Sequence, residues 1–307
     1  MENKQFGKKA ESLINLKKEG LFDKNLLILP ELPSKDTFFS LLEKNGFKES
    51  SDLAVRFSSA QKNTNLPRSI ILSSFEQVYN FVKENLNNSL TAIIHDFVIP
   101  KFSGTLTKNN NQIYISLING AWEISSSKNC DEITILGDKA KILFNPHKKE
   151  CLFVNKDKLE KKIIQNNEDN LIKVVKTIFE KLNNLNLKEN LFYEFIVSED
   201  NNLTIMEYKD LSFNIPSFSN EINDYFEIKE YGDIDKWDKH KDIVLSLIIE
   251  REEDEKFLKI AEYIKRFKDK VYVKYGLCSH PAILLREEGL MVVPFNQKFQ
   301  VLEISLN

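Results

Sequence analysis

The sequence has 307 residues, with 43 Lys and Arg against 46 Asp and Glu, which gives a formal net charge of −3. The length predicts two domains, and 42% hydrophobic with 29% charged residues is a globular balance that argues against wholesale disorder. The charge argues against a nucleic-acid partner. No apolar run approaches the roughly 18 residues that span a bilayer, so no membrane partner is expected. Three cysteines without a Cys-x-x-Cys, and polar first residues without a signal peptide, predict a cytoplasmic protein.

The first third of the chain predicts helices alternating with short strands. Gly20 and Gly46 follow helical patterns, where a left-handed residue often ends a helix, and Ser73 with Glu76 forms a possible capping box. The expected elements are a helix over Lys8–Lys18, a strand over Leu26–Leu29, a helix over Ser34–Lys44, a strand over Leu53–Phe57, and a helix with Phe75, Val78, Tyr79, Val82 and Leu86 on one face.

A strand-rich block follows, with turn residues between β-favouring runs. The expected strands are Ala92–Val98, Ser103–Thr107, Gln112–Ile118, Glu132–Leu136, Ala140–Phe144 and Cys151–Val154; then come helices over Lys156–Ile164 and Leu171–Leu182, and strands over Leu191–Val197 and Leu203–Tyr208.

The last part of the chain has a β/α pattern. Residues 213–224 are expected to be a linker, because they are rich in Pro, Ser and Asn without periodicity. The sequence therefore predicts an α+β or α/β protein with domains over residues 1–212 and 225–307. The expected elements of the second domain are a strand over Asp242–Ile249, a helix over Glu252–Phe267, a strand over Val271–Val273, a helix over Ala282–Glu288 and a strand over Met291–Val293.

The most specific local motif is Gly276-x-x-Ser279-His280-Pro281, which leads into Arg286-Glu287 and Gly289. Pro281 suits the first turn of a helix, so His280 is expected at a helix N-terminus, where free N–H groups and the helix dipole favour an anion. A histidine there could carry a phosphoryl group on a ring nitrogen. A helix-capping histidine without chemistry is the alternative.

This motif resembles the swivelling phosphohistidine domain of the phosphoenolpyruvate synthase and pyruvate phosphate dikinase family, a group that also includes L-glutamine kinase and rifampicin phosphotransferase. The resemblance implies that His280 is the phosphoryl carrier, supported by Gly276, Ser279 and Arg286. It also implies an ATP-grasp nucleotide domain followed by a small β/α phosphohistidine domain.

The N-terminal region is similar to the ATP-grasp domain of the same family. Gly7-Lys8-Lys9 looks like its Gly-x-Lys opening, Val55-Arg56-Phe57-Ser58 is similar to its Val-Arg-Ser-Ser segment, and Gly120-Ala121-Trp122-Glu123 to its Gly-Leu-Gly-Glu turn. The resemblance implies that Lys9, Arg56 and Glu123 bind ATP. A solvated helix start for Lys9 and a salt bridge for Arg56 are the alternatives.

Glu194 and Glu207 lie on two expected adjacent strands, and Lys209 shares the face of Glu207. Carboxylate oxygens suit Mg²⁺ bridging ATP phosphates, which Lys209 would neutralise. The family carries its metal-binding acid and a Gln-x-Arg pair on the corresponding strands. A solvent-facing ladder of charges is the alternative.

The resemblance implies an ATP-dependent phosphotransferase that uses Mg²⁺, passes a phosphoryl group through His280 to a small polar acceptor, and releases AMP and Pi. However, the segment from Ser58 to Ser69 lacks the family's Gly-rich loop, and the chain has no separate acceptor domain. The alternative is a degenerate nucleotide-binding subunit whose partner protein supplies the acceptor site. An ATP-grasp ligase that forms an acyl phosphate leaves the His280 motif unexplained.

Overall fold

The structure is a computed structural model that describes residues 6–61, 66–67, 69–121, 130–144, 150–155, 158–163, 167–210, 222, 224–247, 249, 253–274, 280–295 and 300–306. For 150–155, 158–163, Asp210, His280 and Gln300, only the backbone is described. Within these residues, no helix is long and apolar enough to cross a membrane.

The chain divides into two compact units. The first unit comprises Met1–Pro100, Val154–Glu160 and Glu194–Lys209, and the second comprises Lys101–Phe153, Lys161–Tyr193 and Asp210–Asn307. Helices and strands occur in both, so the expected mixture of α and β structure is confirmed. The predicted boundary between residues 212 and 225 stays a prediction, because most of this segment lies outside the described residues.

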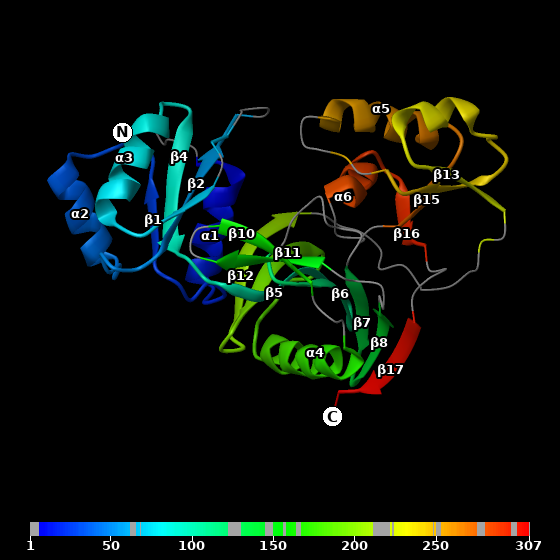
Figure 1. The fold of residues 1–307 in the computed structure, drawn as a ribbon, viewed down its shortest axis with the longest axis horizontal. Helices are drawn as coiled ribbons and strands as arrows, with labels where there is room; N and C mark the ends of the chain where they lie inside the picture. Colours follow the sequence, from blue (N-terminus) through cyan, green and yellow to red (C-terminus); the bar gives the residue numbers. More distant parts are fainter. Residues whose placement is uncertain are drawn as a thin grey trace. The chain divides into compact units, whose positions relative to one another are not determined.

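The first unit is built on a four-stranded sheet with the order β1-β4-β2-β3 (Figure 1). All of its strand pairs are antiparallel. Its elements are helix α1 (Lys8–Lys18), β1 (Leu26–Leu29), α2 (Lys35–Lys44), β2 (Leu53–Ser59), β3 (Ile70–Leu72), α3 (Phe75–Asn85) and β4 (Leu90–Asp96).

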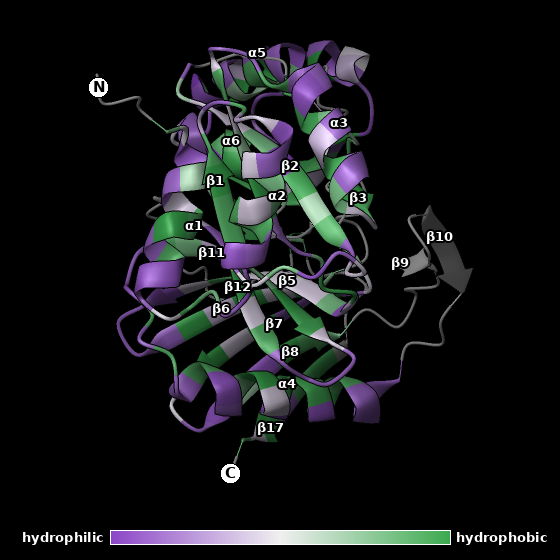
Figure 2. Cartoon of the chain, turned by 90° about the vertical axis from the view of Figure 1, so that its left-hand side faces the viewer, coloured by the Kyte–Doolittle hydropathy of each residue, from purple (hydrophilic) through white to green (hydrophobic). Residues whose placement is uncertain are grey.

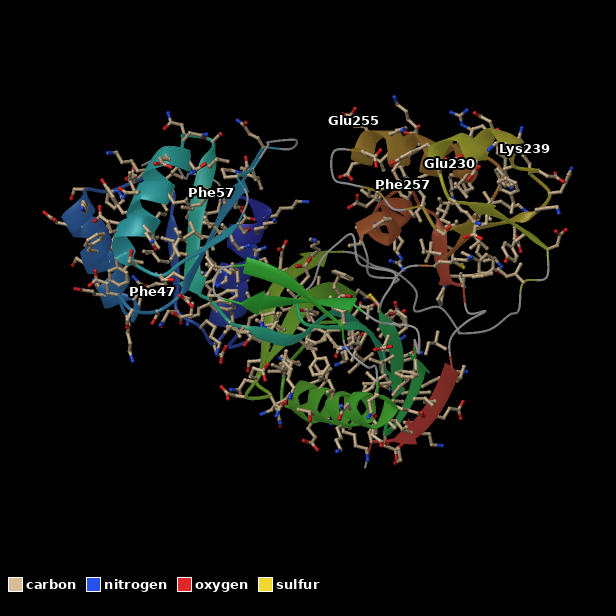
Figure 3. All side chains as sticks on the ribbon, viewed as in Figure 1. Phe47, Phe57, Glu230, Lys239, Glu255 and Phe257 are labelled. Atoms are coloured by element: carbon tan, nitrogen blue, oxygen red, sulfur yellow. The ribbon has the colours of Figure 1, made fainter. Side chains whose placement is uncertain are left out.

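Helices α2 and α3 bury apolar stripes against the strands. Phe38, Leu42, Val78 and Val82 belong to one core that also contains Phe57, one of the residues labelled in Figure 3. In Figure 2 the strands are largely hydrophobic, whereas the helices alternate between hydrophobic and hydrophilic residues. Burial of this stripe therefore stabilises the helices, since helices of ten or eleven residues are marginal alone.

The start of α3 differs from the prediction. Ser74 is the N-cap, and its side chain accepts a hydrogen bond from the Gln77 backbone N–H at 3.3 Å. Ser73 instead donates its hydroxyl to Asp52 at 2.7 Å, and Glu76 pairs with Lys35 at 2.5 Å. The predicted Ser73 and Glu76 capping box is therefore wrong, because tertiary partners engage both side chains.

A seven-stranded sheet has the order β12-β11-β5-β6-β7-β8-β17. Helix α4 (Glu168–Asn183) lies beside this sheet (Figure 1). Its buried residues are Leu171, Val175, Ile178 and Leu182. The strands are β5 (Pro100–Asn109), β6 (Gln112–Asn119), β7 (Asp131–Leu136), β8 (Lys139–Phe144), β11 (Leu191–Ser198), β12 (Leu203–Asp210) and β17 (Gln300–Ser305).

One helix prediction is wrong. Most of the segment expected to be helical over Lys156–Ile164 is strand β10 (Lys158–Ile163), which pairs with β9 (Glu150–Asn155) in a two-stranded sheet. The apolar residues Leu159 and Ile163 are four positions apart, which puts them on one face of a helix and equally on one face of a strand, so the sequence fits both. The neighbouring strand decides between the two by supplying hydrogen-bond partners.

Within the second unit, residues 225–295 form a β/α lobe, named here the C-terminal lobe. Its strands form a parallel sheet in the order β13-β14-β15-β16. Its elements are β13 (Tyr225–Ile228), the 3₁₀ helix η2 (Tyr231–Lys236), β14 (Asp242–Leu245), α5 (Asp254–Lys265), β15 (Lys270–Val273), α6 (His280–Glu287) and β16 (Met291–Pro294).

The two faces of this parallel sheet are covered differently. Phe257 of α5 (labelled in Figure 3) and Leu285 of α6 share a core with Leu245 and Val273, because right-handed crossovers put successive helices on one face. Val244, Tyr272 and Val293 alternate with those residues and form a second, smaller buried cluster. The chain then leaves the lobe, and β17 pairs antiparallel with β8. The predicted domain over 225–307 thus includes a strand of the seven-stranded sheet.

Candidate functional site

The beginning of α1 lies directly against β2 in the first unit. A Cβ atom added to Gly7 would lie 2.3 Å from Ser58 Oγ and 2.3 Å from the Ser59 carbonyl oxygen. The Ala10 backbone N–H donates to Ser58 Oγ at 3.4 Å. Only glycine at position 7 permits this approach, which fixes the first turn of α1, and therefore Lys9, beside the strand that carries Arg56.

The same helix is also bonded to β12. Ser12 Oγ accepts a hydrogen bond from the Tyr208 backbone N–H at 2.7 Å, and Asn15 Nδ2 donates to the Tyr208 hydroxyl at 2.9 Å. Lys9 precedes Ser12 by three residues, so the two side chains share one face of the helix. This face therefore brings the Lys9 ammonium towards the β11–β12 hairpin.

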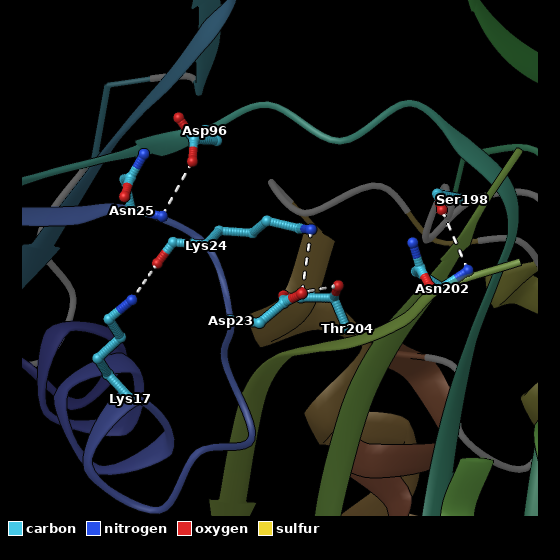
Figure 4. A network of polar contacts seen from close by, with 8 residues as sticks. All are labelled: Lys17, Asp23, Lys24, Asn25, Asp96, Ser198, Asn202 and Thr204. Carbon is cyan, nitrogen blue, oxygen red and sulfur yellow. Dashed lines mark hydrogen bonds and ion pairs between the residues drawn. The ribbon is translucent and has the colours of Figure 1, made fainter. Parts of the chain in front are cut away.

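Further polar contacts attach β12 to the segment after α1 (Figure 4). Thr204 Oγ1 donates to Asp23 Oδ1 at 3.2 Å, and Lys24 Nζ lies 3.1 Å from the other oxygen of Asp23. The Asn25 backbone N–H donates to Asp96 Oδ2 of β4 at 2.9 Å. Together these bonds place the hairpin, α1 and the four-stranded sheet in one fixed arrangement.

Arg56 of β2 and Glu207 of β12 form the first ion pair of the site. Arg56 Nη2 donates to Glu207 Oε2 at 3.3 Å. The Glu207 side chain is 6% exposed and that of Arg56 is 19% exposed. Taking two charges out of water costs free energy, so an ion pair this deeply buried is weak evidence of a purely stabilising role.

Lys209 and Glu194 form the second ion pair, between β12 and β11. Lys209 Nζ donates to Glu194 Oε1 at 3.0 Å. Both side chains are half-buried. The alternative of a solvent-facing ladder therefore does not describe this hairpin, because Glu207 is buried and Glu194 is partly so.

The charges around Glu194 come from three cations. Burial alone would raise the pKa of Glu194, but the neighbouring Lys209, together with the charges of Arg56 and Lys9, outweighs burial and holds this pKa below its ordinary value. Burial would lower the pKa of Lys209, but Glu194 and Glu207 raise it above its ordinary value. Both groups are therefore charged at neutral pH.

The five side chains that the sequence assigns to ATP and metal in this unit thus converge. The cluster, named here the nucleotide cluster, consists of Lys9, Arg56, Glu194, Glu207 and Lys209. Three cations against two carboxylates leave one net positive charge. Such a set can accept a polyphosphate, because Arg binds phosphate oxygens through a planar fork and Lys as a point charge.

The donor set also fits a magnesium ion accompanied by phosphates. Mg²⁺ in nucleotide sites is held by one or two carboxylates plus phosphate oxygens and water, and Glu194 and Glu207 supply two carboxylates. In the described part of the chain, no group of three or more His, Cys, Asp or Glu side chains could hold a metal by itself. Two carboxylates beside cationic side chains therefore fit an ion that arrives with a nucleotide.

His95 lies on β4, opposite Ala54 of β2, and is 3% exposed. Its Nδ1 donates to the Asp96 carbonyl oxygen at 2.8 Å, and its ring meets Phe22 edge-on at 5.8 Å. Burial and the charge of Arg56 lower the pKa of His95 to about 4, so the ring is neutral beside the nucleotide cluster.

The remaining predicted site residues belong to other parts of the chain. Glu123, Gly276 and Ser279 lie outside the described residues. His280 is the first residue of α6, as expected from the motif, but its side chain is outside the description. Arg286 is a half-buried residue in the last turn of α6.

Sequence reasoning missed the residues that hold α1 on the hairpin. Ser12 and Asn15 are uncharged polar residues that lie next to the apolar residues Leu13 and Leu16 in the sequence, a signal that could have indicated a buried polar contact. Tyr208 gives no comparable signal, because its two bonds to α1 depend on a fold that joins positions 193 and 196 residues apart.

Comparison with known proteins finds no matching family model and no matching curated protein. Several solved structures are similar. The D-alanine-D-alanine ligase from Coxiella burnetii aligns at 11% identity and a TM-score of 0.35, over 66% of this chain and 46% of the ligase. A carboxyaminoimidazole ribonucleotide synthase from Aspergillus clavatus, complexed with ATP, aligns at 11% identity and a TM-score of 0.37, over 67% of this chain and 45% of the synthase.

The L-amino acid ligase from Bacillus licheniformis aligns at 13% identity and a TM-score of 0.32, over 67% of this chain and 43% of the ligase. This chain therefore covers less than half the length of each of these three enzymes. Alignments of this quality determine neither a common fold nor a common function.

Proposed function

We propose that the first unit binds ATP with Mg²⁺ at the nucleotide cluster and that the protein is an ATP-dependent enzyme with an ATP-grasp domain. The observation that carries this proposal is the convergence of Lys9, Arg56 and Lys209 on two carboxylates, from segments up to two hundred residues apart. The nucleotide cluster has a net positive charge, which suits an incoming polyphosphate. The ion pair of Lys209 and Glu194 is partly exposed, so a ligand can reach it.

The residues would have distinct tasks. Lys9, Arg56 and Lys209 would bind phosphate oxygens and exchange part of their present pairing with Glu194 and Glu207 for the nucleotide. Glu194 and Glu207 would hold Mg²⁺, which supplies charge neutralisation at the phosphates when it is bound. Positioning and charge neutralisation are the main sources of catalysis in phosphoryl transfer.

The proposed reaction passes through His280. Its imidazole nitrogen would attack the β-phosphorus of ATP, with AMP as the leaving group. Water would then release the terminal phosphate as Pi, and the remaining phosphoryl group would pass from the nitrogen to a hydroxyl or amine of a small polar acceptor. The position of His280, at the start of the helix that follows a parallel strand, supports this role.

A second candidate is a nucleotide-binding subunit that works with a partner protein carrying the acceptor site. The absence of glycine between Ser58 and Ser69 favours it, because a Gly-rich backbone approaches phosphates most closely. An ATP-grasp ligase that forms an acyl phosphate remains a third reading, which gives His280 no task.

Incubation with MgATP followed by intact-mass measurement tests the proposal. The wild type and a His240→Ala control are expected to gain one phosphate, and His280→Ala is expected to gain none while still binding ATP in a titration calorimeter. ATP binding without an adduct in the wild type would favour the subunit. Absence of ATP binding at millimolar nucleotide would overturn all three candidate functions.

A further inference from the structure

Four residues lie side by side at the carboxyl edge of the parallel sheet in the C-terminal lobe. Lys229, Ser246, Lys274 and Phe295 each follow the last residue of one strand, β13 to β16 in order. The strand ends are in register, since Ile228 pairs with Leu245, Leu245 with Val273, and Val273 with Pro294. The four side chains therefore follow the same edge of the sheet.

Glu227, on β13, connects the polar members of this row. Its Oε1 accepts hydrogen bonds from Ser246 Oγ at 2.6 Å and from Lys274 Nζ at 2.8 Å. Its Oε2 lies 3.9 Å from Lys229 Nζ. The Lys274 ammonium is also 5.2 Å from the centre of the Phe295 ring. The Glu227 carboxylate thus holds Lys274 in place, and the Ser246 hydroxyl binds the same carboxylate oxygen.

The charges of this group favour an anion. Lys229 and Lys274 against Glu227 leave one net positive charge. Burial would raise the pKa of Glu227, but the hydrogen bonds from Lys274 and Ser246 and the nearby lysine charges hold it below its ordinary value. The Lys274 side chain is 31% exposed, so the ammonium is oriented by the protein and is still reachable from solvent.

We propose that this edge is a phosphate-binding site, in which Lys274 and Lys229 bind the anion, Ser246 turns its hydroxyl from Glu227 to donate a hydrogen bond to the anion, and Glu227 positions Lys274. Parallel sheets of α/β proteins bind ligands beyond the carboxyl ends of their strands. An ammonium, a hydroxyl and a second ammonium match the oxygens of a tetrahedral dianion.

The position of His280 gives this site a task. The chain leaves β15 at Val273, continues through Lys274, and begins α6 at His280. Lys274 directly follows β15, and α6 begins at His280, so the start of α6 belongs to the same carboxyl edge and a phosphoryl group on His280 would be carried there. This task rests on the proposed function, whereas phosphate binding itself does not.

The test is a titration of the uniformly ¹⁵N-labelled full chain with inorganic phosphate, followed by amide NMR shifts at Leu245, Ser246 and Lys274. Site-resolved shifts separate this edge from phosphate bound at the nucleotide cluster. Lys274→Met is expected to weaken binding by about tenfold or more, because a charge-assisted contact is lost. Glu227→Gln is expected to strengthen it about threefold, because a competing negative charge is removed.

Lys268→Met is the matched control. Lys268 is a lysine of the same lobe that lies 3.8 Å from Asp242, at the start of β14, and its replacement is expected to leave the affinity unchanged. Far-ultraviolet circular dichroism checks the fold of each variant, and Ser246→Ala, expected to weaken binding about threefold, replaces Lys274→Met if that variant does not fold.

The proposal predicts opposite effects on phosphate affinity, stronger for Glu227→Gln and weaker for Lys274→Met. An ion pair with only a structural role would not produce this difference. Weaker or unchanged phosphate binding in Glu227→Gln, or no phosphate-dependent shift at this edge in the wild type, would overturn the proposal. ATP affinity measured on Lys274→Met is expected to equal that of the wild type. A failure at this edge is thereby distinguished from a failure of nucleotide binding in the first unit.

Discussion

Arg56 and Glu207 are 151 positions apart in the sequence, yet Arg56 Nη2 lies 3.3 Å from Glu207 Oε2. Their pairing joins β2 of the four-stranded sheet to the β11–β12 hairpin within the first unit. Because both side chains are largely removed from water, each compensates part of the buried charge of the other.

Removing Arg56 alone is expected to be more damaging than removing both charges. Arg56→Ala leaves the Glu207 carboxylate buried without its nearest cation, and we expect a loss of about 3 kcal/mol in the free energy of unfolding. The double variant Arg56→Ala, Glu207→Gln is expected to recover at least about 1 kcal/mol of that loss. Urea denaturation of the wild type, both single variants and the double variant measures the coupling. Additive losses would show that the two side chains do not depend on each other.

ATP affinity tests the nucleotide cluster without relying on stability. Lys9→Ala and Lys209→Ala are each expected to weaken ATP binding about tenfold, because a charge-assisted phosphate contact is lost. Lys44→Ala, which removes an exposed lysine in the last turn of α2, is the control and is expected to bind as the wild type does. Titration calorimetry with MgATP provides the measurement. Equal ATP affinities in the wild type and the three variants would show that the phosphates do not bind at the nucleotide cluster.

We expect the free energy of unfolding to decrease when the pH is lowered, because of His95. Its pKa is lowered to about 4 in the folded state, whereas an unfolded histidine titrates near 6.5. Below pH 6.5 the unfolded chain therefore binds a proton that the folded chain does not, and folding loses up to about 3 kcal/mol by pH 4.

Urea midpoints of the wild type and of His95→Gln, measured between pH 7 and pH 4, test this effect. We expect the variant to lose less stability over this interval than the wild type. His240→Gln, at an exposed position, is expected to keep the full dependence. A variant curve parallel to that of the wild type would show that other groups cause the acid sensitivity.

Gly7 is expected to tolerate no side chain. Alanine would place a Cβ 2.3 Å from backbone and side-chain oxygens of β2, so α1 must shift, at a cost of about 2 kcal/mol or more. The shift is also expected to weaken ATP binding, because Lys9 moves with the helix. Gly232→Ala is the control, since no atom lies within 4 Å of the position that a Cβ would take there. Thermal unfolding of the two variants gives the comparison, and equal midpoints would contradict the prediction.

Local pattern predicted most elements of the described chain correctly. The helix over Lys8–Lys18 and the strand over Leu26–Leu29 agree with the structure at both ends. Their apolar residues and the turn residues that follow them are signals that lie within a few positions of each other in the sequence. The helix predicted over Lys156–Ile164 was wrong, since the spacing of its apolar residues fits both a helix and a strand. The strands β13 and β17 were not predicted. The four residues of β13 show no alternation, whereas Leu302 and Ile304 of β17 alternate with polar residues and this short signal was missed.

The sequence by itself determined which side chains are available for phosphate and metal chemistry, because the types and spacing of Lys9, Arg56, Glu194, Glu207 and Lys209 are local facts. Only the tertiary structure decided that these five side chains converge. Their convergence depends on the close approach of α1 to β2 at Gly7 and on the hydrogen bonds of Ser12 and Asn15 to Tyr208. The carboxyl-edge group of Glu227, Ser246 and Lys274 was likewise invisible in the sequence, because parallel pairing alone brings the ends of separate strands together.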